Sequence, residues 1–558
     1  MAAPDSRIVR VFAPERLNAG IASTLGDLEA GAVVRRIWDG DWTVWKPEDR
    51  EISNRLGWLD APVSAAGEVG DIEAFAAAVR GEGFVRAVVL GMGGSSLAPE
   101  VFARSFPTSA GGLELEILDT TEPGAVAGAA ARLDVRRTLF LVSSKSGSTA
   151  ELAALLAFFY DRAVRELGAE GAGRRFAAVT DPGSPLEALA GSLGFRRVFH
   201  GRPDVGGRFS ALSAFGLLPA GLKGIDLARL LASARLAAGE CRSETLVENP
   251  GALLGAILGA AALRGLDKLT LLVPPRLAPL AGWLEQLVAE STGKEGRGVV
   301  PVVEGRPRPA DRFGADRLFV EIGEEASEGL DAAGRTLVDA GHPLVRLSLD
   351  DPYDLGGHFF LWEFATAVAG HVLGINPFDQ PDVESTKKKT RQVLAGAGGG
   401  PAPRLRLDGP PWPTGAAEAL TSFFGASRDG DYFALLAFLP PRDEVAAALG
   451  RLAASLRTRF GRPVTVGVGP RYLHSTGQLH KGDGNRGLFL MLTGANPAGV
   501  PIPEVPGLAR PAATFADLFR AQASGDRLAL EEKGRRVLTI ELCGQPGPAL
   551  DGLRALLE

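Results

Sequence analysis

Short β-branched runs alternate with Ala- and Leu-rich segments of helical period over residues 75–235, and this alternation constrains the fold more than any other feature. Strands that alternate with helices form crossover units, which build parallel sheets covered by helices on both faces. The same pattern returns further along the chain. The sequence therefore predicts two doubly wound α/β units. The predicted strands are 85–90, 115–119, 138–143, 176–180 and 198–200 in the first unit, and 269–274, 299–303, 318–322 and 344–349 in the second.

The remaining segments set the predicted domain boundaries of this 558-residue chain. Apolar residues at helical spacing near the N-terminus, as in Val33-Val34-Arg35-Arg36-Ile37-Trp38, predict helices there. Residues 394–415 are dense in glycine and proline, which sustain neither helix nor strand, so we expect a connecting loop. Further strands are expected at 432–439, 464–468, 488–492 and 537–542. The predicted domains are an N-terminal helical segment (1–70), a first α/β domain (71–240), a second α/β domain (241–545) and a C-terminal helix (546–558).

Composition and charge narrow the possible functions. Hydrophobic residues make up 46% of the chain and charged residues 23%, a balance typical of a globular protein. The net charge of −6 argues against nucleic acid as a partner, and the basic run 387–389 is too short to change that. Cys241 and Cys543 match no metal-ligand spacing, so we expect no metal, no disulfide framework and a reducing, cytoplasmic setting. No stretch resembles a signal peptide or a membrane span, so no membrane partner is expected.

A glycine-rich turn follows the first predicted strand of the first unit. Residues 91–97, with the sequence GMGGSSL, join that strand to the start of a helix. Glycines let a backbone approach an anion, and the N-terminus of a helix offers N–H groups and a favourable dipole. The pattern is not the dinucleotide fingerprint, because no third glycine opens the helix. An ordinary tight turn explains this loop equally well, but Gly93, Gly94 and Ser95 are candidate phosphate-binding residues.

A second loop of this kind spans residues 143–149, with the sequence SSKSGST, and precedes a predicted helix. It gathers hydroxyls, an ammonium and a glycine around a helix N-terminus, which suits a phosphate monoester. A solvated capping turn is the alternative. Two such loops after two strands of one sheet favour phosphate binding, because open α/β sheets bind ligands beyond the carboxyl ends of their strands. The candidate residues are Ser144, Lys145, Ser146 and Thr149.

Together with three further segments, these loops resemble the phosphoglucose isomerases, a family with two sugar-isomerase-type α/β domains. The resemblance runs over most of residues 30–500, and it is specific because five motifs occur jointly. It implies an enzyme that interconverts glucose 6-phosphate and fructose 6-phosphate by ring opening and C2-to-C1 proton transfer through a cis-enediol. It implies no metal and no cofactor. The matching segments are Gly91–Leu97, Ser144–Thr149, Val205–Ser210, Ala289–Lys294 and Asn376–Lys387.

The resemblance also assigns roles to single residues, and the chemistry explains why they are needed. Glu290 is the candidate base, since one carboxylate must reach both carbons. Arg208 is the candidate cation for the enediolate oxygen, and Gln380 is a candidate phosphate contact. Ring opening needs a group that titrates near neutrality, which suits histidine. His474 lies in a segment that resembles the family's His-Ser-x-Gly-Gln form, and His480 is the alternative.

Lys387 is the candidate catalytic lysine because it lies seven residues after Gln380, as in the family. The neighbouring Lys388 and Lys389 remain open as alternatives, since only this offset distinguishes the three. The other four histidines carry no motif that favours catalysis. His358 and His371 are expected to pack within helices, and His200 and His342 show no pattern.

The order of the motifs departs from the family. In familiar members the histidine segment precedes the Gln380 motif, whereas here it follows, so the tail looks permuted. This order resembles the isomerase half of fused transaldolase and phosphoglucose isomerase proteins. No barrel-length sequence precedes Gly91, so we expect isomerase activity alone. A homodimer is expected from the resemblance only. An isomerase for another phosphosugar, such as an amino sugar or mannose 6-phosphate, and a non-catalytic sugar-phosphate sensor are the alternatives.

Overall fold

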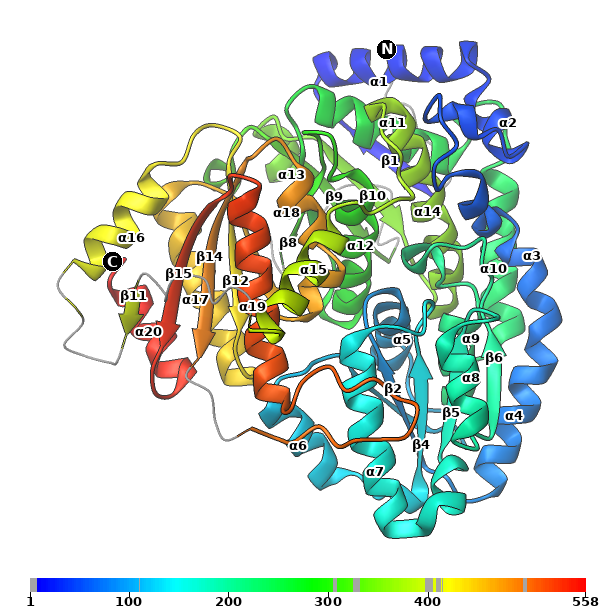
Figure 1. The fold of residues 1–558 in the computed structure, drawn as a ribbon. Coiled ribbons are helices and arrows are strands. Elements are labelled where there is room, and N and C mark those ends of the chain that lie inside the picture. Colours follow the sequence, from blue (N-terminus) through cyan, green and yellow to red (C-terminus); the bar gives the residue numbers. More distant parts are fainter. Residues whose placement is uncertain are drawn as a thin grey trace.

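Three five-stranded sheets organise the protein, as the computed structural model shows (Figure 1). The third sheet lies to the left in Figure 1 and the first to the lower right. Short helices precede the first sheet: α1 (Glu15–Ala30), α2 (Val33–Trp38), α3 (Ala61–Ser64) and α4 (Val69–Gly81). The structure describes residues 8–109, 111–304, 309–324, 332–396, 405–407, 413, 415–494 and 499–557.

The first sheet has the strand order β3-β2-β4-β5-β6 and is parallel throughout. Ala87 and Val89 of β2 pack into one core, and Val88 and Leu90 pack into another on the opposite face. Both faces are therefore buried, which explains the continuous apolar runs that predicted these strands. Its elements are β2 (Arg86–Gly91), α5 (Gly94–Ser105), β3 (Glu114–Leu118), α6 (Pro123–Arg132), β4 (Thr138–Ser143), α7 (Ala150–Gly173), β5 (Phe176–Thr180), α8 (Pro185–Ser192), β6 (Arg197–His200) and α9 (Ala214–Lys223).

The second sheet has the order β1-β10-β9-β7-β8. Its four later strands are parallel, as predicted, which confirms the α/β fold class. β7 contributes to the same hydrophobic core as β4, so the first two units pack as one body. The elements are α10 (Leu227–Glu240), α11 (Pro250–Leu263), β7 (Lys268–Leu272), α12 (Ala278–Thr292), β8 (Val300–Glu304), β9 (Arg317–Gly323), α13 (Ala332–Asp339), β10 (Leu344–Ser348) and α14 (Leu355–Leu373).

The N-terminal segment differs from the all-helical prediction. Residues Val9–Phe12 form β1, which pairs antiparallel with β10, with Val9 opposite Leu347. Val9 and Val11 are buried, whereas Arg10 and Phe12 are partly exposed, which is the period-two pattern of a strand. β1 covers the edge of β10 that would otherwise expose unpaired backbone groups.

The residues after the glycine- and proline-rich connector form a third sheet of their own, with the order β11-β15-β14-β12-β13. All its pairs are parallel. The connector was expected to hold no strand, yet Leu405–Leu407 forms β11 beside β15. The elements are α15 (Val383–Leu394), β11, α16 (Ala416–Gly425), β12 (Tyr432–Phe438), α17 (Asp443–Phe460), β13 (Val464–Val468), α18 (Gly477–Gly482), β14 (Gly487–Gly494), α19 (Phe515–Glu532), β15 (Arg536–Leu542) and α20 (Pro546–Ala555).

The three sheets share one topology. The order β13-β12-β14-β15 of the third sheet repeats the order β3-β2-β4-β5 of the first and β8-β7-β9-β10 of the second. The third unit docks on the second through a core that joins Tyr432 and Phe489 to Ala289 of α12 and Val302 of β8. Helix α12 therefore lies at the junction of the units, and it carries Glu290.

Candidate active site

The first glycine loop packs directly against two other loops. A Cβ atom on Gly94 would lie 1.9 Å from the carbonyl oxygen of Gly207, beside Arg208. Gly93 has a φ of +57°, and a Cβ there would lie 3.0 Å from Gln286 Nε2 and 3.1 Å from the His474 oxygen. Only glycine permits these approaches, because any side chain would collide with backbone or leave a strained conformation. The loop thus brings the Arg208 segment and the His474 segment together.

The second loop forms a network of hydroxyls before α7. Ser144 Oγ lies 3.2 Å from Thr149 Oγ1 and accepts from the Gly147 N–H at 3.1 Å. Ser146 Oγ lies 3.1 Å from Ser148 Oγ. These hydroxyls surround the N-terminus of a long helix, a position that favours an anion. Ser95 is buried in the first turn of α5, the helix that follows the first loop.

The Lys145 ammonium is turned away from these hydroxyls. It donates to Asp181 Oδ2 at 2.5 Å and to the Arg202 carbonyl oxygen at 3.0 Å. Asp181 follows β5, so the ammonium spans to the loop after the neighbouring strand. A phosphate contact by Lys145 therefore remains a prediction.

Arg208 and Glu290 form a buried ion pair, with 3.3 Å between Nη1 and Oε1. The guanidinium also donates to Gln380 Oε1 at 2.7 Å and to Ser291 Oγ at 2.7 Å. Burial lowers the pKa of the Arg208 guanidinium, and the Glu290 carboxylate opposes this shift. An arginine so paired keeps its charge near neutral pH. Three predicted site residues, Arg208, Glu290 and Gln380, thus form one hydrogen-bonded group.

Two further residues hold this group in place, and the sequence analysis assigned neither a role. Gln286, one helical turn before Glu290, donates to Glu290 Oε2 at 3.0 Å and to the His474 oxygen at 2.8 Å. Lys294 donates to the Asn376 oxygen at 2.6 Å and to Asp379 Oδ1 at 2.8 Å. Burial, and then repulsion from Arg208, lower the pKa of Lys294 to about 7. Gln286 and Glu290 are four residues apart on one helix, and this i,i+4 spacing is the sequence signal that could have identified Gln286.

His474 pairs with a carboxylate from the helix that follows the second loop. Its Nε2 lies 2.9 Å from Glu151 Oε1, and Glu151 also accepts from Gln522 Nε2 at 2.7 Å. Burial raises the pKa of the Glu151 carboxyl, but the attraction and hydrogen bond of His474 outweigh it, so the pKa falls below its ordinary value. A carboxylate on Nε2 fixes the tautomer, which leaves Nδ1 to accept or return a proton. Sequence analysis missed Glu151, which lies two residues after Thr149.

The alternative histidine, His480, lies in a different environment. Its ring packs 5.0 Å from the Phe489 ring and 5.9 Å from the Tyr472 ring, inside the core beside the third sheet. Burial lowers the pKa of His480 well below its ordinary value, so this imidazole is neutral. His358 and His371 each donate a ring N–H to a carbonyl oxygen, that of Ser348 and of Val44 respectively, which matches the packing role expected of them.

Two of the three adjacent lysines of α15, Lys387 and Lys389, have different ion-pair partners. Lys387 is about half exposed and pairs with Glu384 at 2.7 Å, one turn earlier. It lies close enough to Glu151 to contribute to the lowered pKa of that carboxyl. Lys389 instead pairs with Glu532 of α19 at 3.1 Å. Of these two, Lys387 faces the candidate site, although no hydrogen bond joins it to the other predicted site residues within the described ranges.

No group of three or more His, Cys, Asp or Glu side chains in the described ranges is arranged to hold a metal ion. No helix in the described part of the chain is both long and apolar enough to cross a membrane.

Comparison with known proteins agrees with the geometry. The family model for phosphoglucose isomerase matches residues 75–300. The glucose-6-phosphate isomerase of Symbiobacterium thermophilum is 32% identical over 393 residues, which cover 61% of this chain and 87% of the relative. That of Thermus thermophilus is 33% identical over 399 residues, which cover 62% of this chain and 92% of the relative.

Solved structures share the fold. A hypothetical protein from Thermus thermophilus superposes with a TM-score of 0.59 at 29% identity and covers 70% of this chain and 100% of its own. A glucose-6-phosphate isomerase from Chlamydia trachomatis superposes with a TM-score of 0.57 at 19% identity, over 68% of this chain and 87% of its own, and supports the fold alone. Given the match to 87% of a curated relative at 32% identity, this chain belongs to the phosphoglucose isomerase family.

Proposed function

We propose that this chain interconverts glucose 6-phosphate and fructose 6-phosphate. The observation that carries the proposal is the Arg208–Glu290 pair, 3.3 Å apart and linked by Gln286 to the His474 backbone. His474 in turn pairs with Glu151 in the first turn of α7, whose N-terminus is lined by hydroxyls. A carboxylate, a fixed cation and a histidine next to an anion site are the groups that an aldose–ketose isomerisation of a phosphosugar needs.

Binding begins with the phosphate at the second loop. Ser144, Ser146 and Thr149 offer hydroxyls to its three oxygens, and the dipole of α7 favours its charge. Ser95 from the first loop and Gln380 complete the proposed set, with Gly93 and Gly94 keeping the backbone close.

Ring opening moves a proton from the anomeric hydroxyl to the ring oxygen. His474 is the group proposed for this step, with Nε2 bound to the Glu151 carboxylate and Nδ1 left for the sugar. The paired carboxylate stabilises the imidazolium that forms when Nδ1 takes a proton. Lys387 is proposed as an additional cation at the sugar, on the strength of its offset from Gln380 and its place near Glu151.

Isomerisation of the open chain follows. Glu290 removes the proton from C2, and the enediolate that forms places negative charge on an oxygen beside Arg208. Once the hydroxyl proton of O2 has passed to O1, return of the carbon-bound proton from Glu290 to C1 forms the C2 carbonyl of fructose 6-phosphate and restores the Glu290 carboxylate. Gln286 keeps the carboxylate oriented throughout, since it donates to Oε2 while Oε1 faces the guanidinium.

The test is Glu290→Gln, which keeps the side-chain shape and removes the base. We expect sugar-phosphate binding within about threefold of wild type and isomerisation lowered by about 10²- to 10⁴-fold. Glu295→Gln is the matched control, because this carboxylate lies five residues on and pairs with Lys46 at the surface. Wild-type turnover in Glu290→Gln would refute the assignment of Glu290 as the base. Faster turnover of mannose or amino-sugar phosphates than of glucose 6-phosphate would show that the substrate is another phosphosugar.

A homodimer in the cytoplasm is proposed from the resemblance. The groups proposed for catalysis, Glu290, Arg208, Gln380 and His474, nevertheless gather within one chain, the first three through direct contacts and His474 through Gln286. We therefore expect turnover per chain to stay constant when the protein is diluted below its dimer dissociation constant, as followed by sedimentation. Activity that falls in step with the dimer would show that the site needs a second copy.

A further inference from the structure

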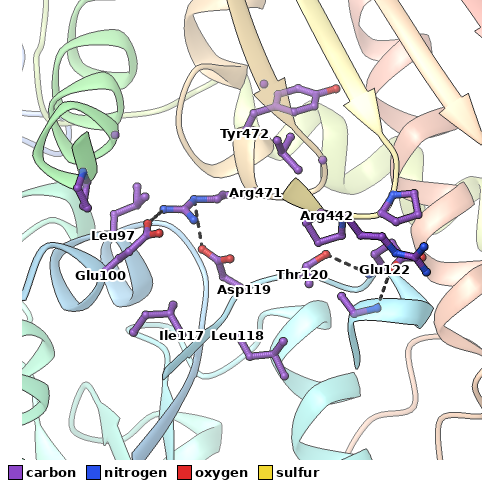
Figure 2. A pocket seen from close by; sticks show the side chains of 18 of the residues that line it. Leu97, Glu100, Ile117, Leu118, Asp119, Thr120, Glu122, Arg442, Arg471 and Tyr472 are labelled. Carbon is purple, nitrogen blue, oxygen red and sulfur yellow. Dashed lines mark hydrogen bonds and ion pairs between the residues drawn. The ribbon is translucent and has the colours of Figure 1, made fainter. Parts of the chain in front are cut away.

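A cavity of about 800 Å³ lies behind the His474 turn, between the first unit, α12 and the third unit (Figure 2). It is lined by α5, by the residues after β3 and by β13, and it includes Arg471, Tyr472 and Ser475 but not His474. Figure 2 shows Arg471 reaching from the third unit toward Glu100 and Asp119. The cavity therefore borders one of the contacts between the third unit and the first.

Arg471 joins the two units through a pair of carboxylates. Its Nη2 contacts Glu100 of α5, and its Nε lies 3.3 Å from Asp119 Oδ2, directly after β3. Both carboxylates are largely buried, with side chains 18% and 12% exposed, so water screens the pairs weakly. A planar guanidinium that binds two carboxylates fixes orientation as well as distance.

The position of Arg471 in the chain connects this contact to catalysis. A short 3-10 helix spans Arg471–His474, so the imidazole and the guanidinium belong to one rigid turn. Glu100 lies on α5, whose first turn follows Gly93 and carries Ser95. Arg471 thus ties the histidine turn to the helix that carries the first phosphate loop.

The other attachments of the turn do not replace this contact. Tyr472 donates to Asp526 Oδ2 at 2.7 Å, and Asp526 belongs to α19 of the same third unit. The Gln286 amide meets the His474 oxygen, and the His474 ring pairs with Glu151 of α7, so both contacts hold the end of the turn. The start of the turn needs its own contact with the first unit, because the backbone can otherwise pivot about its held end. Arg471 supplies that contact through Glu100 and Asp119.

We propose that Arg471 is a positioning residue for ring opening, which by binding Glu100 and Asp119 sets the His474 imidazole against the sugar held by the first unit. The inference rests on the proposed function. Proton transfer requires the imidazole within hydrogen-bond reach of the ring atoms, and small displacements cost rate steeply. Arg471 itself touches no substrate in this arrangement.

The experiment compares Arg471→Met with Arg442→Met. Arg442 lines the same cavity but is exposed, and within the described residues its ion-pair partner is the nearby Glu444, at 3.7 Å. Two rates are measured for each protein: anomerisation of glucose 6-phosphate by NMR exchange, which reports ring opening alone, and isomerisation to fructose 6-phosphate. We expect Arg471→Met to lower both kcat values at least tenfold with KM within threefold, and Arg442→Met to change neither by more than twofold.

Other outcomes would overturn the inference. Arg471→Met with both rates within twofold of wild type would do so. So would a loss of isomerisation with normal anomerisation, since that would place the effect on Glu290. A rise in KM at constant kcat would mean that the contact serves phosphate binding. A wild-type protein without isomerase activity would instead refute the proposed function.

Glu100→Gln provides a second variant, because Arg471→Met leaves two buried carboxylates without their cation and can unfold the junction. Glu100→Gln keeps Arg471 paired with Asp119 and removes one of the two charges that orient it. We expect anomerisation and isomerisation to fall together, by about threefold or more, with an unchanged melting temperature. Rates equal to wild type in this folded variant would overturn the inference even if Arg471→Met cannot be purified.

Discussion

The replacement Glu285→Gln tests the electrostatics of the junction between the units. Glu285 lies on α12, one residue before Gln286, and lines the cavity that contains Arg471. Burial raises the pKa of its carboxyl to about 7, and the attraction of Arg471 only partly opposes this shift. Glu285 is therefore protonated over a pH range in which an exposed glutamate is ionised.

The size of the effect follows from that pKa. The carboxyl has an ordinary pKa of 4.5 and a folded-state pKa of about 7, and each pH unit corresponds to about 1.4 kcal/mol. The folded protein binds the proton more tightly than the unfolded chain, so the free energy of unfolding falls as the pH rises from 4.5 to 7. The total loss is about 3 kcal/mol, complete above pH 7. Glutamine has the same shape, does not titrate and avoids this loss.

We therefore expect Glu285→Gln to exceed wild type in stability by less than about 1 kcal/mol near pH 5 and by about 3 kcal/mol at pH 8. Urea unfolding of both proteins at pH 5, 6, 7 and 8, followed by tryptophan fluorescence, measures the difference at each pH. Contributions from other groups cancel in that difference. A difference that stays constant from pH 5 to pH 8, or that favours wild type as the pH rises, would refute the reasoning.

Three further predictions concern the site. Glu151→Gln removes the charge that pairs with His474, so kcat for isomerisation should fall at least about tenfold with little change in KM, and an unchanged kcat would contradict the role of this pair. Gly94→Ala places a Cβ against the Gly207 carbonyl, so calorimetry or urea unfolding should show a loss of about 1–3 kcal/mol, and normal stability would show that the loop adjusts. Lys294 has a pKa lowered to about 7, so the folded protein loses this proton at a lower pH than the unfolded chain does. The free energy of unfolding of the wild type should therefore rise by about 1 kcal/mol per pH unit between pH 7 and pH 10. Lys294→Met should lack that rise when unfolding is measured at pH 7, 8 and 9, and parallel profiles would contradict the shift.

Much of the fold could be predicted because buried parallel strands are apolar on both faces. The runs 138–143 and 176–180 coincide with β4 and β5, and 464–468 coincides with β13. β1 and β11 were missed because they are short edge strands that depend on a partner: β1 on β10 and β11 on β15. The separation of the third sheet from the second was also missed, because local pattern does not say which strands pair. The domain boundaries given from the sequence remain predictions.

The residues of the candidate site likewise fall into those that the sequence predicts and those that only the structure reveals. Arg208, Glu290, Gln380 and His474 were chosen from the sequence because each lies in a motif that resembles the family, and the structure brings these four into contact directly or through Gln286. The partners of these residues come from distant segments: Glu151 is 323 positions from His474. No local pattern points to such a pair. The turn of Lys145 toward Asp181 likewise depends on the loop after a neighbouring strand.

The sequence by itself determined the α/β class and most of the strands, and it pointed to the two loops proposed to bind phosphate and to the residues proposed for the chemistry. These features depend on residue type and on neighbours within one or two turns, which a sequence displays directly. Only the tertiary structure decided that the tail forms a third unit, that this unit delivers His474 to the first two, and that Arg471, Gln286 and Glu151 fix its place. Those outcomes depend on how separately formed units pack, where buried charges and close backbone contacts select one arrangement.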